Sequence, residues 1–200
     1  MQEHTITSYL DALFDMTRQS HVTDLHGNAL SLEEGAERAI RMIADVRSAS
    51  RKVMLGGNGG SAAIVSHAQN DLSESSGVRA MVFTEQPVLT ARANDFGYGS
   101  VLERPIELWA EPGDLLITVS SSGKSENIIR ALRSAREKQC ELMTFSGFNP
   151  DNPSRSMGDL NFFVPSSVYA YVETAHVTLL HYVTAGVTAA VDAAETRVHP

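Results

Sequence analysis

Cysteine is nearly absent from this sequence, because Cys140 is the single one among 200 residues. One thiol cannot build a disulfide framework. The opening residues, MQEHTITSYLDALF, have neither a basic leader nor an apolar signal core. Nothing in these features indicates secretion, and we expect a protein of a bacterial-type cytoplasm.

Clusters of basic residues and long apolar runs are missing as well. The formal net charge is -8, with 16 Lys and Arg against 24 Asp and Glu. Nucleic-acid surfaces draw most of their affinity from a basic stripe, so we expect no nucleic-acid partner. No uninterrupted apolar run approaches the roughly 20 residues of a membrane-spanning helix, so we expect no membrane partner. An anionic ligand would have to be held by local dipoles rather than by overall charge.

What the sequence does contain is a change of hydrophobic period after the first fifty residues. Apolar spacing in YLDALFDM and a capping box formed by Ser31 and Glu34 predict two amphipathic helices within residues 1–50. In the rest of the chain, β-prone runs alternate with helix-length segments, and this alternation predicts an α/β fold with a parallel sheet covered on both faces. The β-prone runs lie at 53–55, 80–83, 115–119, 142–145 and 161–164, with helix-length segments at 61–73, 100–110 and 126–138.

The predicted last helix, residues 168–194, is apolar on more than one side and nearly free of charge after Glu173. A helix with so few polar positions is usually buried, and in a chain of this size part of the burial is expected to come from another subunit. We expect one domain over residues 1–200, with its α/β core and last helix in 51–194 and with residues 1–50 used in oligomer packing.

Two loops follow predicted strands, where a doubly wound sheet binds ligands and helix N-termini present free N–H groups. The first, residues 56–61, reads GGNGGS, and its glycines let the backbone approach a ligand closely. The second, residues 120–125, reads SSSGKS and supplies hydroxyls that can donate to phosphate oxygens. One serine cluster before a helix is more often a cap, but two such loops in one sheet favour a phosphorylated ligand.

The glycine loop also fits another phosphate-binding pattern. Residues 57–62 match the dinucleotide fingerprint G-x-G-x-x-A, and Glu85 near the end of the next strand could act as its ribose-binding acid. That interpretation leaves the serine loop without a role. The spacing G-x-x-x-x-G-K-[ST] does not occur, which argues against ATP hydrolysis.

Polar side chains interrupt two predicted helices. His67 and Asp71 stand four residues apart and share one face, where they can converge on a proton or a metal; an ordinary surface pair is the alternative. Glu173, His176 and His181 interrupt the last helix, where burial without partners would be costly. His181 leans back toward Glu173, so one ion or small substrate could lie between them. His176 is the weaker candidate and fits a satisfied core or interface histidine.

Four stretches, in this order, resemble the sugar isomerase (SIS) domain proteins of the phosphoheptose isomerase type: GGNGGSAAIVSHAQNDL, ARANDFGYGSV, DLLITVSSSGKSENIIRAL and VETAHVTLLH. The similarity runs from about Ser31 to the last helix. It implies a homotetramer of three-layer αβα subunits, each with a five-stranded parallel sheet preceded by two helices. It also implies an aldose–ketose isomerase that converts sedoheptulose 7-phosphate into D-glycero-D-manno-heptose 7-phosphate through an enediolate.

The resemblance further assigns site residues. It places the phosphate on Ser120, Ser121, Ser122 and Ser125, and the sugar on Asn58, Gly59, Gly60, Ser61, Asn94, Asp95 and Glu173. It places the ligands of one Zn²⁺ per subunit on His67, Asp71, Glu173 and His181. Asp71 or Glu173 is then expected as the catalytic base, with His181 as its acid partner.

Two of these positions depart from the family pattern. Asp71 stands where the family usually has glutamate, which draws the carboxylate back by roughly 1.5 Å. Glu173 stands where the family usually has glutamine. A His/Asp/Glu/His set is still a good set of ligands for a divalent metal. The departures therefore bear on the substrate assignment more than on metal binding.

Two rival functions stay open. One is a non-catalytic SIS scaffold or phosphosugar sensor, such as the initiator-associating protein of bacterial replication. Retention of His67, His181 and two carboxylates favours an enzyme over that rival. The other is an isomerase for a different ketose phosphate, which differs only in the length of the sugar.

Overall fold

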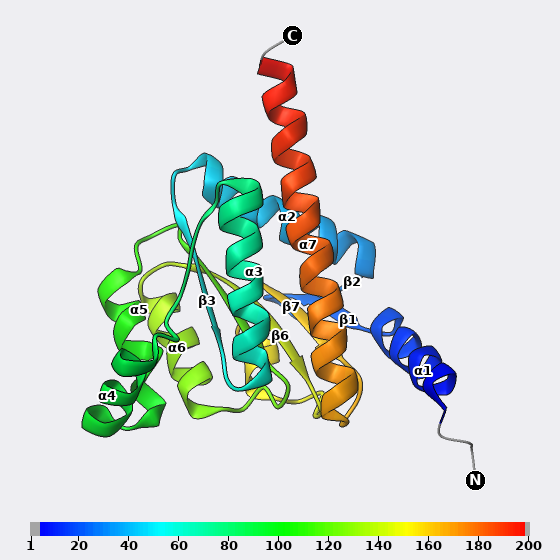
Figure 1. The fold of residues 1–200 in the computed structure, drawn as a ribbon, viewed down its shortest axis with the longest axis horizontal. Helices are drawn as coiled ribbons and strands as arrows, with labels where there is room; N and C mark the ends of the chain where they lie inside the picture. The colour runs from blue at the N-terminus through cyan, green and yellow to red at the C-terminus, as the bar shows by residue number, and fades with distance from the viewer. Residues whose placement is uncertain (1–4, 199–200) are drawn as a thin grey trace.

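A computed structural model describes residues 5–198 of the protein (Figure 1). The strands are β1 (His21–Asp24), β2 (Ala29–Leu30), β3 (Lys52–Gly57), β4 (Arg79–Val82), β5 (Leu115–Ser120), β6 (Glu141–Gly147) and β7 (Leu160–Val164). The helices are α1 (Ile6–Arg18), α2 (Leu32–Ser48), α3 (Gly60–Ser76), α4 (Gln86–Phe96), α5 (Glu103–Trp109), α6 (Glu126–Glu137) and α7 (Tyr169–Val198). Short 3-10 turns form η1 (Tyr98–Ser100) and η2 (Pro153–Ser156).

The strands form one sheet in the order β2-β1-β7-β6-β5-β3-β4. The five strands from β7 to β4 run parallel. Every residue of β5 and β7 is buried, as expected for strands that are covered on both faces. The chain runs from β3 outward to β4 and then returns to β5 on the other side of β3. The topological switch point, where such sheets bind ligands, therefore lies between β3 and β5.

The strand count differs from the sequence prediction. The five predicted runs form the parallel part of the sheet, but residues 1–50 contain a hairpin besides their two helices. Strands β1 and β2 pair antiparallel, and β1 also pairs antiparallel with β7. The Asp24 carboxylate holds the turn, because it accepts hydrogen bonds from the N–H groups of His26 and Asn28 at 2.8 and 2.9 Å. The α/β class is confirmed, and the sheet has seven strands rather than five.

Helices cover both faces of the sheet and enclose two apolar cores. Helices α2, α3 and α7 pack on one face, where Ile43, Val65 and Val183 are fully or almost fully buried. Helices α5 and α6 pack on the other face around Ile106 and Leu132. This arrangement gives the three layers that the sequence predicts.

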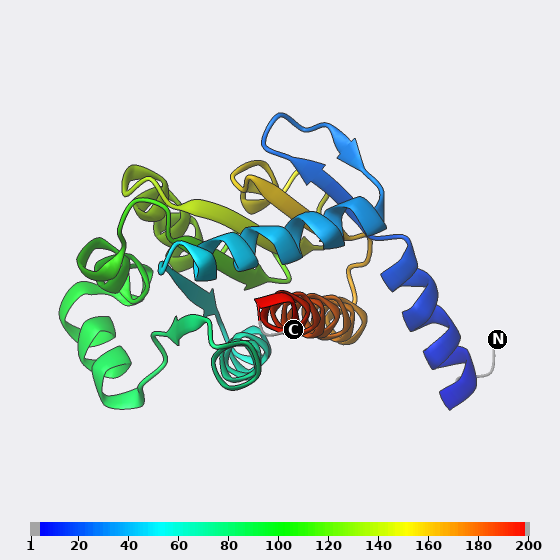
Figure 2. The same cartoon turned by 90° about the horizontal axis from the view of Figure 1, so that it is seen from above.

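The two N-terminal helices differ in how they are held. At α2 the predicted capping box is present: Ser31 Oγ accepts the Glu34 N–H at 3.1 Å, and the Glu34 carboxylate accepts the Ser31 N–H at 2.8 Å. Helix α1 instead projects from the body of the molecule in both views (Figures 1 and 2). It buries Leu13 and leaves Ile6 and Phe14 exposed, so this chain covers little of its apolar face.

Helices α3 and α7 lie side by side and run in the same direction, and Figure 2 views both nearly end-on. Their starts meet at Gly60 and Glu173, and further along Ser76 and Thr188 share a hydrogen bond of 2.9 Å between their hydroxyls. Within the described residues, Tyr169–Ala194 of α7 is the one stretch long and apolar enough to cross a membrane, and 33% of its most apolar window is buried. The other part of this helix faces away from the chain's own core.

Candidate active site

The glycine loop connects the end of β3 to the start of α3. Gly59 has φ 53° and ψ -123°, a backbone conformation that is costly for any residue with a side chain. Gly59 and Gly60 are exposed, whereas Ser61 is buried. No side-chain hydrogen bond caps the start of α3. The first turn of this helix is therefore open to a partner from outside the loop.

The serine loop follows β5, which is the sheet neighbour of β3, so both loops lie at the switch point. Ser125 is the N-cap residue of α6, yet its side chain makes no capping hydrogen bond. Ser121 Oγ is buried without a hydrogen-bond partner in the described part of the chain. Ser120 is buried at the end of β5, and Ser122 Oγ accepts the Lys124 N–H at 3.4 Å. Capping of α6 thus does not account for the cluster, which leaves hydroxyls available to a ligand.

Asn58 is joined to two residues that the sequence analysis missed. Its Oδ1 accepts hydrogen bonds from Asn127 Nδ2 and from the Tyr98 hydroxyl, each at 2.9 Å. Its Nδ2 donates to Asn127 Oδ1 at 3.0 Å. These contacts join positions 40 and 69 residues apart, which no local pattern indicates. The one available signal is that Asn127 follows the serine loop almost directly.

Asn94 and Asp95 lie on α4, a helix with no buried residue. Asn94 Nδ2 donates to Asp95 Oδ1 at 2.9 Å, and both side chains are exposed. No hydrogen bond in the described chain joins this pair to the other predicted sugar-binding residues. Tyr98, which follows α4 in the chain, does bond to one of those residues, because its hydroxyl donates to Asn58.

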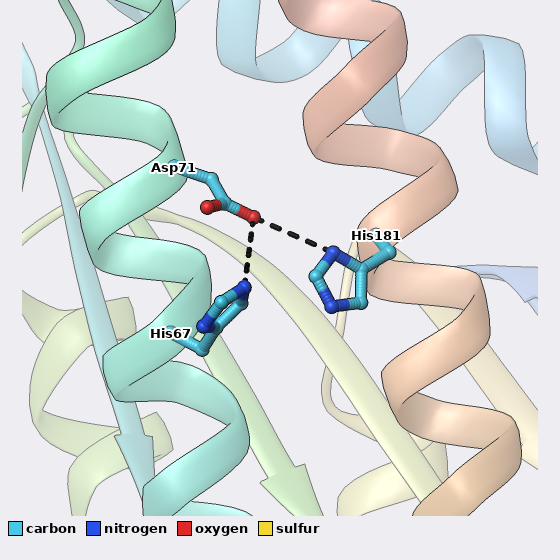
Figure 3. Close-up of side chains that lie close together, drawn as sticks. All are labelled: His67, Asp71 and His181. Carbon is cyan, nitrogen blue, oxygen red and sulfur yellow. Dashed lines mark ion pairs between the residues drawn. The ribbon is translucent and has the colours of Figure 1, made fainter.

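His67, Asp71 and His181 converge between α3 and α7 (Figure 3). Asp71 Oδ2 lies 3.5 Å from His67 Nε2 and 3.4 Å from His181 Nδ1. The two imidazole rings meet edge to face with their centroids 4.7 Å apart. One turn of α3 places His67 and Asp71 on the same face, and the parallel packing of α7 brings His181 to them.

This donor set fits a divalent metal ion. Two imidazole nitrogens and one carboxylate oxygen lie within 4.8 Å of one another. Tetrahedral zinc with bonds of roughly 2.0–2.1 Å holds neighbouring ligand atoms about 3.3 Å apart. The separations of 3.4 and 3.5 Å between Asp71 and the two rings are close to that value. Three protein ligands would also leave one position for water or substrate, as in catalytic zinc sites.

The three residues line an open groove of about 250 Å³ between α3 and α7. The remaining wall is mostly apolar and is formed by Ala63, Ile64, Ala68, Val177, Leu180 and Thr184. The serine loop and α4 do not contribute to this lining. Glu173 and Gly60 lie at the starts of the same two helices, and the seven residues from Gly60 to His67 span about 10 Å along α3.

Glu173 does not join the cluster, contrary to the expected four-ligand set. Its carboxylate lies against Gly60, where an added Cβ would come within 2.7 Å of Oε2. Eight residues separate Glu173 from His181, or about 12 Å along the helix axis. The start of α3 carries the positive end of the helix dipole, and Gly60 has no side chain to keep a carboxylate away. Glu173 therefore lies beside the glycine loop rather than beside the two histidines.

His176 lies on the opposite, sheet-facing side of α7 and is completely buried. Its Nε2 lies 3.1 Å from the Ser146 carbonyl oxygen, and its ring packs edge-on against Phe145. Burial lowers the pKa of His176 to about 4, although the hydrogen bond to Ser146 opposes this shift. His176 is therefore a neutral core residue at pH 7, in agreement with the simpler of its two predicted roles.

Comparison with known proteins identifies the family of this chain. The model of the SIS domain family matches residues 22–147. The phosphoheptose isomerase of Aliarcobacter butzleri is 33% identical over 157 residues, which cover 76% of this chain and 82% of that protein. The phosphoheptose isomerase of Geobacter sulfurreducens is 33% identical over 148 residues, which cover 71% of this chain and 78% of that protein.

Solved structures show the same fold. The phosphoheptose isomerase of Neisseria gonorrhoeae aligns with a TM-score of 0.79 at 22% identity, covering 91% of this chain and 97% of that one. The NanR protein of Vibrio vulnificus, complexed with ManNAc-6P, aligns with a TM-score of 0.65 at 16% identity, covering 97% of this chain and 67% of that one. With matches over most of its length in both sequence and fold, the chain belongs to the SIS domain family and groups there with the phosphoheptose isomerases.

Proposed function

We propose that this protein is an aldose–ketose isomerase that converts sedoheptulose 7-phosphate into D-glycero-D-manno-heptose 7-phosphate. The names of its curated relatives support this activity. The observation that carries the proposal is the convergence of His67, Asp71 and His181 in the groove between α3 and α7. These side chains come from two separate helices, and their chemistry matches the proton transfers of an isomerisation.

The substrate's phosphate is assigned to the serine loop: Ser120, Ser121, Ser122 and Ser125. The unused hydroxyl of Ser125 and the partnerless Oγ of Ser121 support this assignment. The start of α6 adds a favourable dipole for a dianionic group. The sugar is assigned to Asn58, Gly59, Gly60, Ser61, Asn94, Asp95 and Glu173, which lie on the glycine loop, on α4 and at the start of α7.

Isomerisation requires removal of a proton from the carbon beside the carbonyl, followed by protonation of the enediolate at the neighbouring carbon. Asp71 or Glu173 acts as the base, and His181 is the acid partner. Asp71 Oδ2 and His181 Nδ1 lie 3.4 Å apart, so a base and an acid at these positions can serve two adjacent carbons of one substrate. The apolar walls of the groove limit the access of water to the enediolate.

We assign a zinc-like ion to His67, Asp71 and His181, because their donor atoms fit one. When bound, such an ion supplies Lewis-acid polarisation of the substrate carbonyl. Elemental analysis of protein purified without chelators or affinity-tag nickel tests this assignment. About one metal per subunit is expected, and an Asp71→Asn variant should lose most of it. Full activity without stoichiometric metal would contradict the assignment.

A homotetramer is our proposal for the assembly. Apolar side chains on α1 and α7 support it, since Ile6, Phe14, Tyr169 and Tyr182 are exposed in the single chain. Contact with a second copy would remove these apolar side chains from water, which is favourable in free energy. Light scattering coupled to gel filtration measures the mass directly; a monomer at micromolar concentration would overturn the proposal. Cytoplasmic location, and the expectation of neither nucleic-acid nor membrane partners, stay predictions from the sequence.

The activity is tested with purified protein and a panel of five-, six- and seven-carbon ketose phosphates, followed by NMR. Conversion of sedoheptulose 7-phosphate, with much slower conversion of the shorter sugars, is the expected result. Preference for a shorter sugar would reassign the substrate within the same reaction class. Binding without conversion of any sugar would contradict the enzyme proposal and favour a phosphosugar sensor.

A further inference from the structure

The hydrogen bonds of Asn58 join three separate segments of the ligand-binding edge. Asn58 belongs to the glycine loop, Tyr98 belongs to η1 directly after α4, and Asn127 lies in the first turn of α6. Each segment carries proposed ligand contacts: the glycine loop itself, the Asn94–Asp95 pair before Tyr98, and the serine loop before Asn127. One amide group is thus bonded to a residue from each of the other two segments.

The two partners differ in burial, and this difference separates their roles. Asn127 is 3% exposed, so its amide makes a fixed pair with Asn58 inside the protein. Tyr98 is 52% exposed, although its hydroxyl reaches Asn58 Oδ1 at 2.9 Å. The turn that carries Tyr98 packs against α6, and Gly99 lies beside the carboxylate of Glu126 on that helix. This packing keeps the backbone of Tyr98 near Asn58, and the hydrogen bond to Asn58 Oδ1 then orients the hydroxyl.

These contacts leave Asn58 with one unused group. Its Oδ1 accepts two hydrogen bonds, which fills both lone pairs, and one N–H of Nδ2 is donated to Asn127. The second N–H has no partner among the residues that the structure describes. A side-chain amide that is free to rotate would present either its oxygen or its nitrogen to a ligand. Here only a donor is available.

We propose that Tyr98 and Asn127 are positioning residues, which fix the Asn58 amide so that it donates one hydrogen bond to a sugar oxygen. This inference rests on the proposed sugar-phosphate function and adds two residues to its site. Neither residue contacts the substrate in this scheme. Their hydrogen bonds also fix the glycine loop, the segment after α4 and the start of α6 relative to one another. The distance between the phosphate-binding loop and the sugar-binding loop is therefore fixed as well.

The test is a Tyr98→Phe variant, which removes one exposed hydroxyl and keeps the ring. Loss of one neutral hydrogen bond is expected to lower kcat/KM for sedoheptulose 7-phosphate by about threefold to tenfold, mostly through KM. Inhibition by inorganic phosphate should be unchanged, because the serine loop is not altered. Tyr9→Phe is the matched control: Tyr9 packs on the Tyr171 ring at the far helix α1 and should behave as the wild type.

A double-mutant cycle separates positioning from direct contact. In an Asn58→Ala background, Tyr98→Phe should change kcat/KM by less than about twofold, because its effect passes through Asn58. An equal loss in both backgrounds would show that Tyr98 contacts the sugar itself and would overturn the proposal. So would an unaltered Tyr98→Phe enzyme or a parallel loss of phosphate affinity. Asn127→Ala, checked for folding by its thermal midpoint, should show the same dependence on Asn58.

The affinity of each protein for sedoheptulose 7-phosphate is measured by calorimetry in addition to its turnover. A wild-type protein that binds this sugar without converting it counts against the proposed function, and the variants then still test the positioning through their affinities. A wild type that neither binds nor converts the sugar overturns both. Normal wild-type turnover with unaltered variants counts against the positioning alone.

Discussion

The two faces of α7 place the same side chain in opposite settings. His176 faces the sheet, is completely buried and lies against the Ser146 carbonyl. His181, little more than one turn further along, faces α3, keeps 47% of its side chain exposed and approaches Asp71 at 3.4 Å. Both residues interrupt an otherwise apolar helix, so the pattern of residue types alone does not distinguish a core histidine from a site histidine. The difference shows that the neighbouring element decides whether a histidine on this helix belongs to the core or to the site.

The largest expected effect comes from replacing the exposed histidine. A His181→Gln variant removes the acid partner and should lower kcat for the isomerisation by about 10²–10⁴-fold, the usual contribution of a positioned acid or base. Its thermal midpoint should stay close to that of the wild type, since the side chain is half-exposed. Turnover and far-ultraviolet circular dichroism check both statements.

His176→Gln is the matched control, because its amide can still donate to the Ser146 carbonyl. This variant should keep kcat within about threefold of the wild type while losing some stability from poorer packing. A His181→Gln enzyme with unchanged turnover would remove that residue from the mechanism. A larger loss of kcat in His176→Gln than in His181→Gln would reverse the comparison between the two faces.

The second expected effect is on acid stability. The pKa of His176 is lowered to about 4, below its ordinary value of 6.5, so below pH 6.5 the unfolded chain binds a proton that the folded chain does not. The free energy of unfolding should therefore fall as the pH drops from 6.5 toward 4, by about 3 kcal/mol from this group. Urea unfolding at pH 7.5 and 4.5 measures the fall.

The His176→Gln variant isolates this contribution from that of the carboxylates. It should lose less stability than the wild type over the same pH interval, because glutamine does not titrate. Equal losses in the two proteins would show that His176 is protonated in the folded state at pH 4.5, which contradicts its complete burial without a charged partner.

The smallest expected effect is at the start of the groove. Glu173→Gln removes the charge beside the first turn of α3 and should cost about 0.3–1 kcal/mol of stability, a shift of about 1–4 °C in Tm. With Asp71 as the base, turnover should change by less than about threefold, because glutamine keeps the size of the side chain. A drop of 100-fold or more would instead identify Glu173, rather than Asp71, as the base.

Much of the fold could be predicted from the sequence, because its signals are local. The buried runs that became β3 and β5, and the capping box of Ser31 and Glu34, depend on neighbouring residues only. The hairpin of β1 and β2 was missed because its strands have four and two residues. Helix α4 was missed because it buries no residue and therefore shows no apolar stripe.

The candidate site was predictable in part for the same reason. Helical spacing places His67 and Asp71 on one face, but the approach of His181 depends on the packing of α7 against α3. The sequence analysis expected His181 to lean toward Glu173, whereas the Glu173 carboxylate turns to Gly60. The bonds from Tyr98 and Asn127 to Asn58 span the sheet edge, so they require the tertiary structure.

The hairpin of β1 and β2 covers one edge of the parallel part of the sheet. Without β1 and β2, the five-residue strand β7 would present an unpaired backbone edge beside the parallel strands. With them, the sheet ends at a two-residue strand on one side and at the four-residue β4 on the other. Edge strands this short offer few backbone N–H and C=O groups for pairing with a strand of another chain. In the proposed homotetramer, contact between copies is therefore expected to come from helices rather than from strand pairing.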